Sequence, residues 1–89
     1  MAVTLTIQHP VADFDAWRPV YERHGAVRAH YGLTGERVYR GADDPNDVCI
    51  VMSAPSHADV EAFMADPSLS EAMQHAGVTA PPTISIADH

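Results

Sequence analysis

A stripe that combines aromatic residues with a histidine is the part of this sequence best suited to chemistry. Trp17, Tyr21 and His24 recur at spacings of four and three residues, which place side chains on one face of an α-helix. Partial burial among aromatic rings lowers the pKa of a histidine from about 6.5 and keeps the ring neutral. A neutral imidazole can take a proton from a phenol or from an activated carbon acid. We therefore predict His24 as a catalytic acid or base; the alternative is a core histidine bonded to a backbone carbonyl or a tyrosine hydroxyl.

Further aromatic and methionine side chains are candidates for the walls of a ligand pocket around His24. The predicted wall residues are Trp17, Tyr21, Tyr31, Phe63 and Met73. Aromatic rings give a flat apolar surface, and the tyrosine hydroxyls can fix the orientation of an aromatic ligand by hydrogen bonds. Methionine adapts to irregular ligand shapes. The alternative is that the same side chains form an ordinary filled core.

Arg28 lies one helical turn beyond His24. Its guanidinium could bind a ligand carboxylate or stabilise the developing charge of an enolate. We include Arg28 among the candidate ligand-binding residues, below His24. The alternative is an arginine that pairs with Glu22 or faces solvent.

Metal and cofactor chemistry find no support in the spacing of the possible ligands. The histidines considered for a metal site are His24, His30, His57, His75 and His89. A local zinc site is built from two ligands that lie two residues apart on a strand or four residues apart on a helix, and none of these histidines forms such a pair. Cys49 is the single cysteine. The acidic turn over residues 43–47 lacks the central glycine and the closing glutamate of a calcium loop. We predict no metal and no cofactor, and the sequence contains no nucleophile elbow or phosphate-binding glycine loop.

Composition and charge exclude several classes of function. The chain has 89 residues, so we expect a single domain over residues 1–89. Twelve Asp and Glu against five Arg and no Lys give a formal charge of −7, which repels phosphate backbones and anionic lipid headgroups. The lone cysteine allows no internal disulfide, and no apolar stretch is long enough for a signal peptide or a membrane span. We predict a cytoplasmic protein that binds neither nucleic acid nor membranes.

The hydrophobic pattern predicts four strands and two helical regions. Alternating apolar residues predict strands over residues 2–9, 36–40, 48–54 and 83–87, with the middle two joined as a hairpin. A helix is expected over residues 13–30, with a kink at Pro19 or a true start nearer Ala16. Gly32 and Gly35 provide the backbone freedom for the exit from this helix. Ser56 caps a helix that ends at residues 66–67, and Ser68 begins a further helical piece.

This order of elements predicts an α+β fold. Strand, helix, strand, strand, helix, strand is the ferredoxin-like βαββαβ arrangement, with both helical regions on one face of a four-stranded antiparallel sheet. The strand over residues 48–54 is apolar at both alternating positions, which is typical of a strand covered on both sides. A second copy of the sheet would cover the face without helices. We therefore predict a homodimer, which also offsets the small core of so short a chain.

The whole chain resembles the dimeric α+β barrel superfamily, which includes small antibiotic-biosynthesis monooxygenases and polyketide cyclases. The resemblance depends on the element order and on four segments, residues 14–24, 37–40, 43–46 and 73–82 with its Pro81-Pro82 pair. It implies two ferredoxin-like sheets packed face to face across a two-fold axis. It also implies a ligand pocket between each sheet and its own helices.

Two functions remain open at this point. The first is a cofactor-independent cyclase-like or monooxygenase-like enzyme that acts on a small aromatic or polyketide-type molecule, a function that the resemblance implies. Such chemistry needs an apolar pocket and one proton-transfer group. The alternative is a non-catalytic dimeric ligand-binding or accessory protein in which the stripe around His24 is core.

Overall fold

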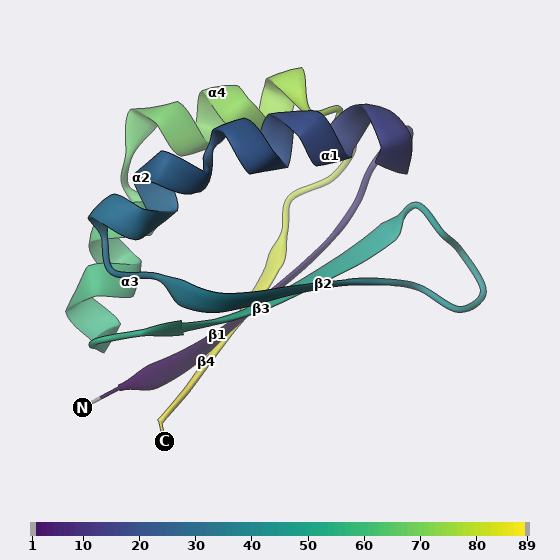
Figure 1. The fold of residues 1–89 in the computed structure, drawn as a ribbon. Coiled ribbons are helices and arrows are strands. Elements are labelled where there is room, and N and C mark those ends of the chain that lie inside the picture. The colour runs from purple at the N-terminus through teal and green to yellow at the C-terminus, as the bar shows by residue number, and fades with distance from the viewer. Residues whose placement is uncertain (1, 89) are drawn as a thin grey trace.

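The computed structural model describes residues 2–88, which form one sheet and four helices (Figure 1). The elements in chain order are β1 (Val3–Pro10), α1 (Phe14–Arg23), α2 (Gly25–His30), β2 (Thr34–Arg40), β3 (Asp47–Ala54), α3 (His57–Met64), α4 (Pro67–His75) and β4 (Thr83–Asp88). All four predicted strands are present, with ends within two residues of their predicted positions. The helices lie together on one side of the sheet, and the loop between β2 and β3 extends beyond its edge (Figure 1).

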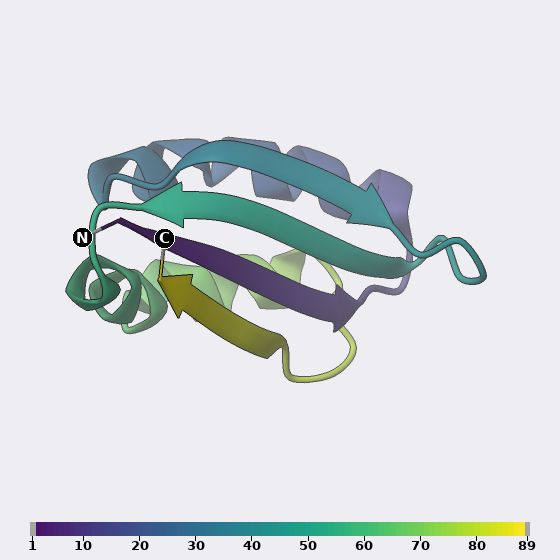
Figure 2. The same ribbon diagram turned by 90° about the horizontal axis from the view of Figure 1, so that it is seen from below.

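The sheet has the strand order of a ferredoxin-like fold. Its order is β2-β3-β1-β4, and each neighbouring pair is antiparallel. Seen from below, all four strands lie in front of the helices, so the face opposite the helices is open in a single chain (Figure 2). The predicted α+β class and four-stranded antiparallel sheet are therefore confirmed.

Strict alternation in the two central strands places the core on the helix side of the sheet. In β3, Val48, Ile50 and Met52 are buried, whereas Cys49 and Val51 between them are half-buried on the open face. In β1 the odd-numbered residues from Val3 to His9 are buried, and the threonines between them, Thr4 and Thr6, are half-buried. A strand residue and the residue two positions later share a face, so each odd position of β1 points toward the helices.

The first helical region differs from the predicted single helix. Asp13 caps α1 through a hydrogen bond from the Asp15 backbone N–H at 3.0 Å, so the helix begins at Phe14 rather than near Ala16. It continues through Pro19 and ends at Arg23, and α2 begins after His24. The predicted continuous helix over residues 13–30 is therefore wrong. Gly25, which has low helix propensity, follows the break directly.

The second helical region is also divided in two. Ser56 caps α3 and accepts a hydrogen bond from the Asp59 backbone N–H at 3.2 Å, as predicted. Asp66 caps α4, which begins at Pro67, one residue before the predicted start at Ser68. Proline is favoured in the first turn of a helix because its missing N–H has no partner there. The break brings Ser68 to the beginning of α4, opposite His24.

The approach to β2 depends on two glycines with left-handed backbone. Gly32 has a φ of 79° and Gly35 a φ of 66°, which confirms that the exit from the helix needs glycine. Gly35 lies where the register of β2 against β3 shifts between Thr34 and Arg37. Arg37 pairs with Val51 on the open face, so the preceding residue, Glu36, lies on the helix side.

Candidate functional site

A cavity with a volume of about 60 Å³ lies between the helices and the sheet. It is lined by Ile7, His9, Trp17, Val20, Tyr21, His24, Arg28, Ile50, Met52, Phe63, Met64, Leu69, Ala72, Met73, Ala76 and Pro82. Six of the seven predicted site residues are in this set. Strands β1 and β3 form its floor, and all four helices contribute to its walls. Most of the lining is apolar, and its titratable side chains are two histidines, one tyrosine and one arginine.

Stacked aromatic rings form one wall of the cavity. The rings of Trp17 and Tyr21 are nearly parallel, with centroids 4.8 Å apart and planes inclined by 20°. Trp17 is 2% exposed, and Phe14 packs on its other side at 5.5 Å. The spacing of four residues along α1 produces this stack, so the predicted stripe exists as a continuous aromatic surface.

His24 lies at the break between α1 and α2, where it contacts α4. Its Nε2 is 3.1 Å from the Ser68 hydroxyl oxygen, and its ring is 6.1 Å from the Phe63 ring. Burial lowers the pKa of His24, and the positive charge of Arg28 lowers it further, against an opposing effect of Asp66. His24 is therefore a neutral imidazole at neutral pH, with a fixed neighbour at one nitrogen.

Arg28 is buried in the cavity wall, so the alternative in which it pairs with Glu22 or faces solvent is wrong. It is 4% exposed, and its Nε is 3.1 Å from a carboxylate oxygen of Glu36. The Nε–H does not point at that oxygen, so the contact is an ion pair rather than a hydrogen bond. The guanidinium carbon lies 3.8 Å from the centre of the Tyr21 ring. Glu36 lies two residues before Val38, which packs against the core, so strand alternation places Glu36 on the helix side, where it meets Arg28.

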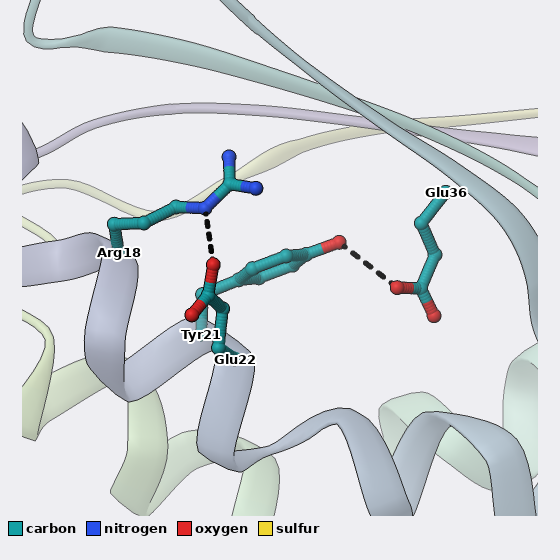
Figure 3. A network of polar contacts seen from close by, with 4 residues as sticks. All are labelled: Arg18, Tyr21, Glu22 and Glu36. Carbon is teal, nitrogen blue, oxygen red and sulfur yellow. Dashed lines mark hydrogen bonds and ion pairs between the residues drawn. The ribbon is translucent and has the colours of Figure 1, made fainter.

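Tyr21 extends from α1 toward β2, and its hydroxyl donates a long hydrogen bond of 3.5 Å to Glu36 (Figure 3). Burial raises the pKa of this phenol, although the charge of Arg28 acts in the opposite direction. Glu22, the alternative partner for Arg28, instead accepts a hydrogen bond from Arg18 at 2.9 Å on the surface (Figure 3). Tyr21, Arg28 and Glu36 thus form one polar group at the β2 side of the cavity.

His9 is a lining residue that sequence reasoning missed. It is 4% exposed, and its Nδ1 is buried without a hydrogen-bond partner. Its ring packs edge-on against Trp17, with centroids 5.9 Å apart. Burial lowers the pKa of His9, partly offset by the backbone of His9 and Pro10 and by the charge of Asp47. The signal was in the sequence, because His9 continues the alternation of Val3, Leu5 and Ile7 on the helix side of β1.

Tyr31 is the one predicted site residue that does not line the cavity. Its ring packs against Phe63 with centroids 5.9 Å apart, and its hydroxyl donates a 2.7 Å hydrogen bond to Asp66. Hydrogen bonds from the Ser68 side chain, from Tyr31 and from the Ser68 backbone lower the pKa of Asp66 to about 2. The side chain of Tyr31 supports Phe63 from outside, and a direct role in ligand binding stays a prediction.

A wider groove of about 280 Å³ adjoins the cavity between α1 and α4. It is lined by Val20, Arg23, His24, Ser68, Glu71, Ala72 and His75. Three residues, Val20, His24 and Ala72, line both spaces. His24 and its contact with Ser68 therefore stand at the boundary between the cavity and the groove.

The described part of the chain contains no cluster of three or more His, Cys, Asp or Glu side chains that could hold a metal ion. One histidine considered for metal binding, His89, lies outside the described residues. Among residues 2–88, no helix has the length and apolarity needed to cross a membrane.

Solved structures with this fold include antibiotic-biosynthesis monooxygenases. SnoaB from Streptomyces nogalater, described as a cofactor-independent oxygenase, has a TM-score of 0.80 at 17% identity, over 99% of this chain and 92% of SnoaB. A protein described as an antibiotic biosynthesis monooxygenase has a TM-score of 0.75 at 13% identity, over 98% and 97%. Rv0793 from Mycobacterium tuberculosis has a TM-score of 0.65 at 12% identity, over 100% and 95%.

No family model matches the chain, and no curated protein matches it in sequence. Identities this low show a shared fold, and a shared fold does not establish a shared function. The predicted resemblance to antibiotic-biosynthesis-monooxygenase-like proteins is confirmed at the level of the ferredoxin-like fold. The chemistry has to be argued from the cavity.

Proposed function

We propose that this protein is a cofactor-independent, monooxygenase-like or cyclase-like enzyme that binds a small aromatic or polyketide-type molecule between its helices and its sheet. In this proposal His24 is the acid or base, and Trp17, Tyr21, Arg28, Phe63 and Met73 surround the ligand. The observation that carries the proposal is the cavity itself, in which a neutral histidine faces a stacked aromatic wall. The fold shared with SnoaB, described as a cofactor-independent oxygenase, supports the same reaction class.

The Ser68 contact orients His24 for proton transfer. Ser68 also hydrogen-bonds Asp66, whose carboxylate can only accept. The Ser68 hydroxyl therefore donates to Asp66, and its oxygen accepts the Nε2–H of His24 at 3.1 Å. This arrangement leaves Nδ1 of His24 as the basic nitrogen. The lowered pKa of His24 keeps the ring unprotonated at neutral pH, so it can accept a proton.

Anthrone illustrates a reaction that such a site can perform. His24 takes a proton from the ring carbon opposite the carbonyl, which leaves an electron-rich enolate. The enolate reduces dioxygen and forms a carbon–oxygen bond, and loss of water then gives anthraquinone. One anthrone and one dioxygen are consumed for each anthraquinone and water produced, and His24 returns its proton. The neighbouring Arg28 stabilises the enolate charge.

Ligand entry requires the cavity to open toward the groove. Pockets for drug-sized ligands hold about 300 Å³ or more, whereas the closed cavity holds about 60 Å³. The adjoining groove of about 280 Å³ shares His24 with the cavity. Met64, Leu69 and Met73 line the cavity with flexible side chains, so their rotation can enlarge it. We infer that ligands enter between α1 and α4.

The alternative is a non-catalytic ligand-binding or accessory protein. The small free volume favours it, because a cavity of this size is mostly filled by its own side chains. In that case the stripe on α1 serves as core and His24 only links α1 to α4.

Oxygen uptake with anthrone, measured after treatment of the protein with a chelator, separates the two functions. The wild type should consume oxygen faster than buffer, and His24→Gln should lose about 100-fold or more of the enzymatic rate. His24→Gln keeps a hydrogen-bonding group for Ser68, and His57→Gln on the exposed end of α3 is the matched control. Anthrone that binds without any oxygen uptake would favour the accessory protein. Full activity of His24→Gln would reject His24 as the base.

A further inference from the structure

The sheet floor of the cavity contains a buried histidine whose Nδ1 has no hydrogen-bond partner. His9 lies on the sheet floor and is 4% exposed, and its Nδ1 is buried without a hydrogen-bond partner. Leaving a buried polar atom unpaired is unfavourable, so native proteins pair nearly all of them. His9 is therefore a position where a bound molecule would complete the structure.

The surroundings of His9 restrict the chemistry of that molecule. The ring packs edge-on against Trp17 at 5.9 Å, and Ile7 and Ile50 lie on the same floor. Burial in this apolar setting keeps the imidazole uncharged. A neutral imidazole has one N–H donor and one acceptor nitrogen. A hydroxyl group, which also donates one hydrogen bond and accepts others, complements it, whereas a carboxylate would lose its hydration without gaining an opposite charge there.

A second feature of the wall, the ion pair of Arg28 and Glu36, restricts the charge of the ligand. Arg28 places a buried positive charge 3.8 Å from the centre of the Tyr21 ring, and Tyr21 stacks on Trp17. Glu36 is the carboxylate paired with this charge. Because Glu36 already balances this charge, the cavity favours an uncharged ligand oxygen, such as a phenol hydroxyl or the carbonyl of its keto tautomer, over a carboxylate.

We propose that His9 is the oxygen-binding residue of the cavity, and that the ligand is a phenol or its keto tautomer held by hydroxyl or carbonyl oxygen at His9. This inference rests on the proposed function and assigns the two histidines different tasks. His9 binds the oxygen at the sheet floor, and His24 reaches the reacting carbon from the boundary with the groove. Because Nδ1 of His9 has no hydrogen-bond partner in the protein, an oxygen bound there selects the tautomer of the ring.

The test compares phenol, toluene and benzoate, three probes of similar size, by NMR titration of the isotope-labelled protein. The wild type should bind phenol and toluene in the cavity, and benzoate should not bind. His9→Phe should raise the ratio of the phenol to the toluene dissociation constant about 5-fold or more, the effect of one lost hydrogen bond. His9→Gln, which keeps a donor and an acceptor, should retain most of the phenol preference. His57→Phe, a substitution of an exposed histidine, should leave the ratio unchanged.

The ring nitrogen signals of His9 in the wild type give a readout that needs no variant. Phenol should move them to the positions of a single fixed tautomer, and toluene should not. If both compounds bind but the His9 nitrogens do not respond, or if His9→Phe leaves the ratio unchanged, the role of His9 is rejected while the cavity remains a ligand site. If neither compound shifts any signal of a cavity residue, the proposed function is rejected together with this inference.

Discussion

The charge on Glu36 holds a buried arginine in the cavity wall, and Glu36→Gln tests this directly. Glutamine has nearly the same shape and keeps a carbonyl oxygen that can accept the Tyr21 hydroxyl. The substitution therefore removes the charge opposite Arg28 and little else. Arg28 is left as a cation that is 4% exposed and has no counter-ion.

The size of the effect follows from the distance and the burial. Two unit charges 3.1 Å apart attract by about 5 kcal/mol at an effective dielectric constant of about 20. The Glu36 side chain is 29% exposed, so water screens part of this attraction, and removing one partner of a fully buried pair costs about 3–5 kcal/mol. We expect Glu36→Gln to lower the free energy of unfolding by about 2 kcal/mol.

The chain contains a matched control pair on its surface. Arg18 and Glu22 are joined by the same atoms at 2.9 Å, but their side chains are 44% and 61% exposed. An exposed pair four residues apart on a helix contributes about 0.3–0.5 kcal/mol. Glu22→Gln should therefore change the free energy of unfolding by less than about 0.5 kcal/mol, although the contact is slightly shorter.

Urea unfolding followed by circular dichroism measures both variants. With a slope of about 1 kcal/mol per molar urea for so small a domain, Glu36→Gln should lower the midpoint by roughly 1–2 M. Added salt should reduce the effect of Glu22→Gln more than that of Glu36→Gln. Equal effects of the two substitutions would show that burial does not strengthen the Arg28 pair, and would refute the electrostatic account of the cavity wall.

Three further predictions concern pH, backbone and assembly. Because the folded-state pKa values of His9 and His24 are lowered, the unfolded chain binds protons first as the pH falls. The contribution of both histidines to stability should be complete above about pH 6.5 and should be lost as the pH falls through their folded-state pKa values. Urea midpoints at several pH values measure this loss. An equal decline of the midpoint in His9→Phe would show that His9 is not a cause. Gly32→Ala combines a φ of 79° with a Cβ 2.8 Å from Pro55 Cγ, whereas Gly35→Ala has a φ of 66° and open space. Thermal melts should show a loss of about 1–2 kcal/mol for Gly35→Ala and a larger one for Gly32→Ala; equal losses would argue against the Pro55 contact. A second copy on the open sheet face predicts a sedimenting species of twice the 9.6 kDa chain mass, and a 9.6 kDa species at micromolar concentration would contradict the dimer.

The sequence predicts the sheet better than the helices because strand alternation is a local signal. Threonine between valine, leucine and isoleucine determines which face of β1 is buried, and the same pattern is present in β3. The break at His24 is accompanied by contacts with other elements, His24 with Ser68 on α4 and Arg28 with Glu36 on β2, and a local pattern does not encode them. Pro19, which suggested a kink, lies on an exposed side of α1, where water can pair the freed carbonyl group.

The candidate site, like the fold, is predictable from the sequence only where the signal is local. The spacing of Trp17, Tyr21 and His24 predicts a shared face, and all three line one cavity. The partner of Arg28 was not predicted, because the ion pair joins α2 to the following strand β2 and a local residue spacing does not specify which side chains meet there. His9 shares the buried face of Val3, Leu5 and Ile7, but its polar side chain does not belong to the apolar pattern that predicts this face. A polar residue at a buried position of a strand is the more informative signal.

Fluorescence of Trp17, the single tryptophan of the chain, tests the central claim most directly. Trp17 lines the cavity, so a ligand bound there must change its emission. We would titrate the wild type with anthrone under nitrogen. A parallel titration of free N-acetyltryptophanamide would correct the emission for absorption and collisional quenching by anthrone. Ala72→Leu, which fills the boundary between cavity and groove, would be compared with Ala62→Leu on an exposed position of α3. The account predicts a saturable change in the wild type and in Ala62→Leu that is lost or weakened at least 10-fold in Ala72→Leu. A linear, collisional response that is identical in all three proteins would contradict a ligand site between the helices and the sheet.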